Sequence, residues 1–148
     1  MSKVRRAKAD DMEAVVRLLK TFPTGLGSTS IDWNNARHAY PELLNGERGL
    51  MLVAEIEGTV VGLVTLGFSF VLRFGGEYAL IEDFIVHTDY RGRGLASLLL
   101  GAAMAEARQR GCSEVQVNGP SKEGLPVYIK NGFVETGEHL KAKTNIDA

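Results

Sequence analysis

The residues with the clearest chemical potential are two glycines interleaved with two arginines in the segment Asp89–Ser97. Gly92 and Gly94 carry no Cβ atom, so a ligand can approach the backbone closely at both positions. Arg91 and Arg93 add two permanent positive charges. Because open backbone and positive charge together suit an anion, we expect this segment to bind one, most simply a phosphate or a pyrophosphate.

A strand and a helix are expected on either side of this loop. The residues before it, Tyr78–Val86, are nearly all apolar and predict a strand. The residues after it repeat apolar side chains at helical spacing, which predicts a helix over Leu95–Arg110 that ends at Gly111. The first N–H groups of a helix have no partner within it, and the helix dipole adds partial positive charge there. We therefore expect the anion at the start of this helix.

Two familiar phosphate-binding patterns do not fit these residues. A Walker-type loop needs Gly-Lys-Ser/Thr at the helix start, where this chain has Gly94-Leu95-Ala96. A dinucleotide fingerprint needs a third Gly or Ala where Ser97 stands, and an acidic residue about 20 positions further on. The next expected strand, Glu114–Asn118, ends on an asparagine instead. Both patterns are therefore excluded.

Two adjacent carboxylates, Glu82 and Asp83, interrupt the otherwise apolar strand expected over Glu77–His87. Burial raises the pKa of a carboxyl group and makes its carboxylate a better base, so both are candidate general bases. Pairing with an arginine, or capping an irregular turn, would explain each of them equally well. Regular alternation predicts that they lie on opposite faces, with Leu80, Glu82, Phe84 and Val86 on one and Ile81, Asp83, Ile85 and His87 on the other.

A tyrosine near the C-terminal end, Tyr128, is a further candidate. It lies on a short helix that is expected to begin at Ser121 or Lys122 and to end at Asn131 or Gly132. A phenol has an ordinary pKa near 10, so it still carries its proton at neutral pH and can donate it. Taken alone, Tyr128 is better explained as a half-buried packing residue, and only its place in a longer motif changes that interpretation.

Two segments together resemble the GCN5-related N-acetyltransferases, the GNAT superfamily. The acyl-CoA loop of that family, Gln/Arg-x-x-Gly-x-Gly/Ala, is matched by Arg91, Gly94 and Ala96. The segment Val127–Phe133 resembles the family's Leu/Phe-Tyr-x-Lys-x-Gly-Phe, in which the tyrosine points at the sulfur of the cofactor. The resemblance covers roughly residues 50–140.

The resemblance implies an enzyme that moves an acetyl group from acetyl-CoA to a primary amine of a small molecule or peptide, by direct transfer in a ternary complex. Acetyl-CoA is then the acyl-donor co-substrate, and no metal is expected. The implied fold is α/β, with a mixed, mostly antiparallel sheet of six or seven strands flanked by helices on both faces. The strands before and after the loop are expected to splay and leave a cleft. Alternatives are a non-catalytic acyl-CoA-binding regulatory module and an interaction domain without the ligand.

The resemblance also implies roles for particular residues. Tyr128 is the implied acid for the departing thiolate. Some relatives place a glutamate base on the strand after the loop helix, where this chain has glutamine, so Glu82 becomes the first candidate base and Asp83 the second. A backbone N–H near Ile85 or Val86 is the expected donor to the oxyanion. The residues expected to bind the cofactor are Phe84, Ile85, Val86, Arg91, Gly92, Arg93, Gly94, Leu95, Ala96, Ser97, Asn118, Ser121 and Tyr128.

Composition bounds the remaining properties. With 148 residues, the chain is expected to form one acyl-CoA-dependent N-acetyltransferase domain over residues 1–148. The net charge of −1 gives no field that would attract nucleic acid or an anionic membrane. A single cysteine excludes an internal disulfide, and no apolar run is long enough to span a bilayer. We expect a soluble, cytoplasmic protein that contacts neither nucleic acid nor membrane. Assembly into a homodimer is left as a possibility.

The rest of the chain is expected to complete the sheet and to cover its other face. Trp33 and Tyr40 lie on an expected helical stretch, Ile31–Leu44, which lines the acceptor pocket in the resembling family; core or surface packing explains them as well. The further expected elements are a strand over Val4–Lys8, a helix capped by Asp10 or Asp11 with the apolar face Met12, Val15, Val16, Leu18 and Leu19, a break over Phe22–Ser28, strands over Leu50–Glu57 and Thr59–Phe70, and a last strand from Phe133 to about Lys141.

Overall fold

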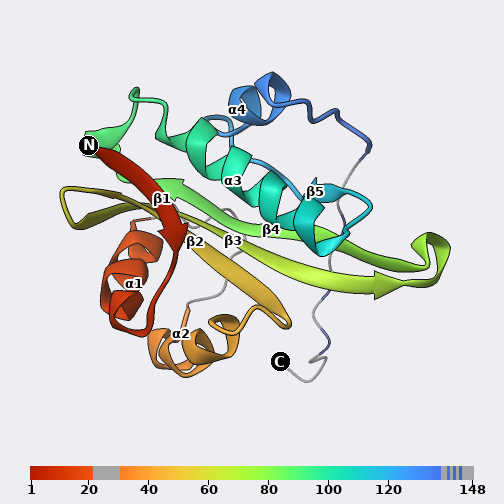
Figure 1. The fold of residues 1–148 in the computed structure, drawn as a ribbon, viewed down its shortest axis with the longest axis horizontal. Helices are drawn as coiled ribbons and strands as arrows, with labels where there is room; N and C mark the ends of the chain where they lie inside the picture. Colours follow the sequence, from red (N-terminus) through yellow and green to blue (C-terminus); the bar gives the residue numbers. More distant parts are fainter. Residues whose placement is uncertain (22–30, 138–139, 141, 143, 145–148) are drawn as a thin grey trace.

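The computed structural model describes residues 1–21, 31–137, 140, 142 and 144. Over these residues the chain forms one sheet of five strands, ordered β1-β2-β3-β4-β5, with four α-helices packed around it (Figure 1). Short 3-10 turns join several of these elements. The bounds are β1 Ser2–Arg6, α1 Met12–Lys20, α2 Trp33–Ala39, β2 Gly49–Ile56, β3 Thr59–Val71, β4 Gly76–Val86, α3 Leu95–Arg110, β5 Val115–Val117 and α4 Leu125–Lys130.

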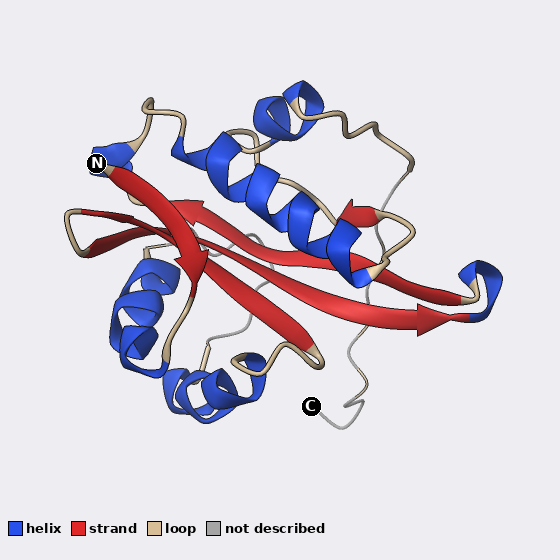
Figure 2. Ribbon diagram, in the orientation of Figure 1, coloured by secondary structure: helices blue, strands red, loops and turns tan. Residues whose placement is uncertain are grey.

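The sheet is mixed and mostly antiparallel. Strands β1 to β4 pair antiparallel with their neighbours in sequence, whereas β5 pairs parallel with β4. Two parallel strands need a crossover between them, which α3 supplies. Figure 2 shows α3 and α4 on one side of the sheet and α1 and α2 on the other. The predicted α/β fold, with helices on both faces, is confirmed.

The number of strands differs from the prediction of six or seven. In the described residues the sheet has five strands, and Phe133–Gly137, where a last strand was expected to begin, forms none. The N–H of Phe133 donates to Tyr128 O at 3.0 Å, because the chain is still closing the end of α4 at that point. The predicted break over Phe22–Ser28 lies outside the described residues.

Hydrophobic side chains cover both faces of the middle strands. Successive residues of β2 point to opposite sides of the sheet: Leu52 belongs to the core cluster beneath α3, together with Leu99, and Val53 to the cluster beneath α1, together with Val15. Strands buried on both faces read as nearly continuous apolar runs rather than as an alternation of apolar and polar residues. This explains why β2 and β3 follow the predicted strands so closely.

The helix after the glycine loop has the predicted bounds, Leu95–Arg110. Gly94 precedes it with a φ of 81° and Gly111 follows it with a φ of 89°, and glycine adopts this left-handed conformation without strain. The N–H of Cys112 donates to Ala107 O at 3.0 Å and closes the last turn. Since α3 leads from β4 to β5, its first turn lies beside the end of β4.

The helical stretch predicted over Ile31–Leu44 forms two separate elements, an α-helix and a 3-10 turn. Helix α2 ends at Ala39 and a 3-10 turn follows over Tyr40–Leu43, because Pro41 has no N–H for a helical hydrogen bond. Tyr40 is only 5% exposed, belongs to the cluster beneath α1 and donates its hydroxyl to Lys8 O at 2.6 Å. Tyr40 is therefore a packing residue.

Helix α1 is not capped by the side chain of Asp11, in contrast to one of the two predicted caps. The carboxylate of Asp11 accepts the N–H of Lys8 at 2.7 Å and pairs with the guanidinium of Arg5 at 2.7 Å, and it makes no side-chain cap for α1. The hydrogen bonds from Arg5 lower the pKa of Asp11. Asp11 thus ties the end of β1 to the turn before α1.

Candidate active site

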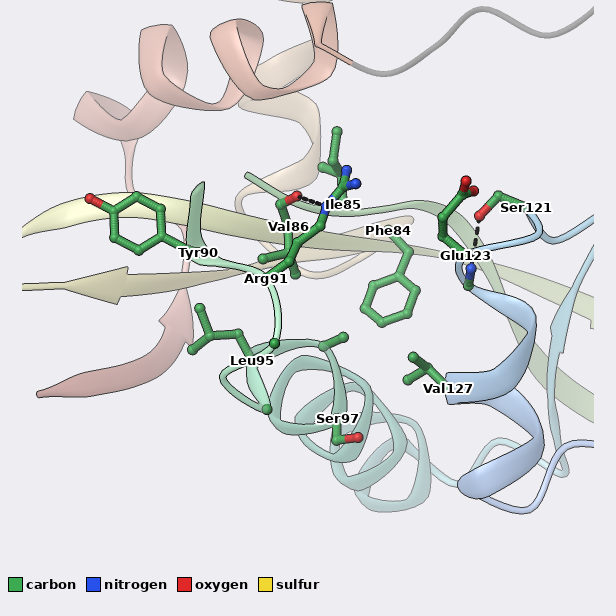
Figure 3. A pocket seen from close by; sticks show the side chains of 14 residues that line it. Phe84, Ile85, Val86, Tyr90, Arg91, Leu95, Ser97, Ser121, Glu123 and Val127 are labelled. Carbon is green, nitrogen blue, oxygen red and sulfur yellow. Dashed lines mark hydrogen bonds between the residues drawn. The ribbon is translucent and has the colours of Figure 1, made fainter. Parts of the chain in front are cut away.

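Strands β4 and β5 separate toward the glycine loop. Their parallel pairing runs from Ala79 opposite Val115 only as far as Ile81 opposite Val117, so the last part of β4 is unpaired on this side in the described chain. A cavity of about 420 Å³ opens there, bounded by the end of β4, the glycine loop, the first turn of α3 and α4 (Figure 3). Its lining comprises Phe84, Ile85, Val86, Tyr90, Arg91, Gly92, Gly94, Leu95, Ala96, Ser97, Ser121, Glu123, Gly124 and Val127.

The backbone of the loop requires its glycines. Gly92 has a φ of 77° and Gly94 a φ of 81°, and a Cβ atom at either position would meet no atom within 4 Å. The first hydrogen bond of α3 runs from Leu98 N–H to Gly94 O at 3.1 Å, which leaves the three preceding N–H groups without a helical partner. Because these residues line the cavity, the predicted anion site is an open helix start with room in front of it.

The two arginines of the loop are placed differently from each other. Arg91 lines the cavity, and its Nε donates to the carbonyl oxygen of Val86 at 3.0 Å, so it fastens the loop to β4 (Figure 3). Its two terminal nitrogens donate to no described residue, so they are free charged donors on a residue that lines the cavity. The guanidinium of Arg93 lies over the ring of Tyr90, 5.1 Å from its centre, and does not line the cavity. Only one of the two predicted cations therefore borders the site.

Ten of the thirteen predicted cofactor-binding residues line the cavity, and Arg93, Asn118 and Tyr128 do not. Asn118 is exposed just beyond the end of β5. Ser121 does line the cavity, and its Oγ accepts the N–H of Gly124 at 3.0 Å, which caps the turn that leads into α4. Sequence reasoning missed four lining residues: Tyr90, Glu123, Gly124 and Val127. Spacing of three residues from Ser121 would have indicated Gly124, whereas the other three had no such signal.

Tyr128 is buried beside Phe84, a residue that lines the cavity. It is only 4% exposed, and its ring centre lies 5.4 Å from that of Phe84 and 5.2 Å from that of Phe133. Burial raises the pKa of its phenol, so the group keeps its proton at neutral pH. The carboxamide of Asn131 donates to Val127 O at 2.8 Å and to Ser97 Oγ at 3.5 Å, which joins α4 to the first turn of α3.

A β-bulge in β4 overturns the predicted alternation of its faces. Thr65 of β3 pairs with Asp83 and Leu66 pairs with Ile81, so Glu82 is an extra residue in β4. Ile81 consequently belongs to the cluster beneath α3, while Ile85 belongs to the cluster beneath α1. The prediction that both lie on one face is wrong, because the extra residue shifts the alternation by one position.

Both carboxylates lie on the face covered by α1 and α2, and the prediction of opposite faces is wrong for them too. Thr65 points to this face, since its neighbours in β3 pack beneath α3, and its hydroxyl donates to Asp83 Oδ2 at 2.7 Å. A Cβ atom at Gly67, which points the same way, would lie 3.7 Å from Glu82 Oε2. Partial burial raises the pKa of Glu82, and the negative charge of Asp83 raises it further.

Of the two predicted oxyanion donors, only Val86 directs its N–H to the edge of β4 that faces the gap between β4 and β5. The N–H of His87 donates to Val61 O on β3 at 2.8 Å. Successive N–H groups of a strand point to opposite edges, so the N–H of Val86 points away from β3 and toward the cavity, whereas that of Ile85 points to β3. The geometry therefore favours Val86.

Comparison with known proteins identifies the family. Residues 12–133 match the model of the acetyltransferase (GNAT) family. The chain belongs to the GNAT family. An acetyltransferase of Sodalis glossinidius is 31% identical over 129 residues, which cover 86% of this chain and 83% of that protein. This GNAT protein is accordingly an acetyltransferase, of a family that uses acetyl-CoA as the acetyl donor.

Solved structures have the same GNAT fold. A structure described as a transcriptional regulator from Bacillus halodurans superimposes with a TM-score of 0.83 at 26% identity, covering 97% of this chain and 99% of that one. A predicted acetyltransferase from Clostridium acetobutylicum, solved with acetyl-CoA, superimposes with a TM-score of 0.80 at 23% identity, covering 97% and 96%. The second likeness shows the fold alone. Within the described part of this GNAT acetyltransferase, no helix is long and apolar enough to cross a membrane.

Proposed function

We propose that this GNAT acetyltransferase moves the acetyl group of acetyl-CoA directly to a primary amine of a small molecule or peptide, within a ternary complex. One observation supports the proposal: a cavity opens where β4 separates from β5, and candidate groups for such a transfer lie beside it and on β4. An open helix start borders the cavity, Tyr128 packs against Phe84 in its wall, and Glu82 lies on the bulge of the same strand.

The cavity suits acetyl-CoA, which supplies the activated acetyl thioester when bound. Leu95, Ala96 and Ser97 offer N–H groups to an anionic pyrophosphate. Open space in front of Gly92 and Gly94 allows the approach that such contacts need.

Residues of this chain would then handle the protons and the developing charge. An amine is mostly protonated at neutral pH, so a base must remove its proton, and the raised pKa of Glu82 suits that task. The N–H of Val86 is placed to donate to negative charge on the acetyl oxygen. Tyr128 keeps its proton and would give it to the departing thiolate.

A thiol-release assay tests the proposal directly. The protein is incubated with acetyl-CoA and panels of amino acids, polyamines, amino sugars, aminoglycosides and peptides, while calorimetry measures CoA binding. We expect CoA to bind and thiol release to depend on one class of amine. Binding without release across all the panels would favour the regulatory module, and absence of CoA binding would overturn the assignment of the cavity.

A further inference from the structure

Thr65 is a buried polar residue in the middle of an apolar strand. It is 5% exposed, and its neighbours Val64 and Leu66 belong to the hydrophobic core. Its hydroxyl has two partners, both on one residue: Oγ1 accepts the backbone N–H of Asp83 at 3.0 Å and donates to the Asp83 carboxylate at 2.7 Å. The hydroxyl thus uses its one donor and one of its two acceptor positions on Asp83.

These two hydrogen bonds lie at the β-bulge itself. An extra residue disrupts the strand ladder, and at this point the N–H of Asp83 donates to the Thr65 hydroxyl. A valine would have nearly the same shape but could neither accept nor donate, and it would leave the N–H and the carboxylate of Asp83 without this partner.

The same contacts distinguish the two carboxylates. Asp83 is held to Thr65 through both its backbone and its side chain. Glu82 makes no hydrogen bond through its carboxylate to any described residue, it is exposed, and its Oε2 lies beside Gly67, which has no side chain. Glu82 is therefore the carboxylate that stays available to an incoming amine.

We propose that Thr65 is a positioning residue: its hydroxyl holds the bulge of β4 and thereby presents Glu82, with Asp83 fixed beside it, to the acceptor amine. The role in turnover rests on the proposed function, while the role in holding the bulge does not. Thr65 does not itself line the cavity, so we expect no direct role for its hydroxyl on acetyl-CoA.

The test compares Thr65→Val with Thr65→Ser, which keeps the hydroxyl. Ser69→Ala is the matched control, because it removes a hydroxyl from the same face of β3 opposite Tyr78, away from the bulge. With the acceptor from the thiol-release assay, we expect Thr65→Val to lower kcat by at least about tenfold with KM for acetyl-CoA nearly unchanged, since small displacements of a catalytic group are costly. Thr65→Ser and Ser69→Ala should keep kcat within about threefold of wild type.

Amide hydrogen exchange followed by NMR tests the bulge without any acceptor. Loss of the Thr65 hydroxyl should speed exchange of the Asp83 amide at least about fivefold in Thr65→Val and leave it near wild type in the other two variants. Wild-type exchange at Asp83 in a folded Thr65→Val protein would overturn the proposal, as would a kcat that falls equally in Thr65→Ser. If wild type binds CoA but turns over no amine, the proposed function fails while the exchange result still decides the role of Thr65.

Discussion

Replacing Gly94 with aspartate tests the anion site at the start of α3. Gly94 has a φ of 81°, which aspartate tolerates better than most residues, and a Cβ atom there would meet no atom within 4 Å. The protein should therefore fold, with a stability cost of about 1–2 kcal/mol for the left-handed backbone. The new carboxylate, however, would stand in front of the free N–H groups of Leu95 and Ala96, where we place the pyrophosphate.

The effect on affinity follows from the contacts that are lost. One charge-assisted hydrogen bond contributes about 1.5–3 kcal/mol. At about 1.4 kcal/mol for each factor of ten, the Kd for CoA should rise roughly 10- to 150-fold. Isothermal calorimetry measures it, with pantetheine as a second ligand: pantetheine has no pyrophosphate, so its affinity should hardly change.

Gly75→Asp is the matched control for this prediction. Gly75 also has a positive φ, 62°, and also has no atom within 4 Å of a Cβ position, but it lies in the turn between β3 and β4 and does not border the cavity. Both variants should lose similar stability, and only Gly94→Asp should lose CoA affinity. An unchanged Kd for CoA in folded Gly94→Asp would refute the placement of the anion on α3.

Three further substitutions separate the other groups. Glu82→Gln should lower kcat about 10²-fold and remove the rise in rate as pH increases through the raised pKa of Glu82, because only the ionised carboxylate accepts a proton; a wild-type pH profile would exclude Glu82 as the base. Tyr128→Phe should lower kcat about 10- to 10³-fold while calorimetry shows nearly unchanged acetyl-CoA binding; full kcat would show that the hydroxyl is not the acid. Gly67→Val should place methyl groups against the Glu82 carboxylate and raise KM for the amine at least about tenfold, with KM for acetyl-CoA unchanged. Equal increases in both KM values would place the amine elsewhere.

The glycine loop and α3 could be predicted from the sequence because their determinants are local. Helical spacing after Gly94 and a glycine at position 111 set both ends of the helix, and each glycine has the positive φ that its position needs. The arginines could not be assigned in the same way. Arg91 reaches back to Val86 O and Arg93 stacks on Tyr90, and these side-chain directions depend on how the loop folds onto β4.

The faces of β4 could not be predicted from period-2 alternation, because a bulge depends on the partner strand. Glu82 is the extra residue only because Thr65, 17 positions earlier in sequence, pairs with Asp83 and supplies the hydroxyl that its N–H needs. Two adjacent carboxylates in an apolar strand were the one local sign of an irregularity. The sequence left each of them open as a base or a structural residue. In the structure, Asp83 is held by Thr65, whereas Glu82 is accessible.

The bulge also decides which backbone groups face the cavity. The N–H of Ala79 donates to Glu114 O beside β5, at 3.0 Å, whereas the N–H of His87 donates to Val61 O on β3. Eight residues separate these two N–H groups, and in a regular strand an even separation would direct both to the same edge. They face opposite edges because Glu82 adds one residue between them. The insertion that brings both carboxylates to the α1 face thus also turns the N–H of Val86 toward the gap, so a single irregularity positions the proposed base and the proposed oxyanion donor together.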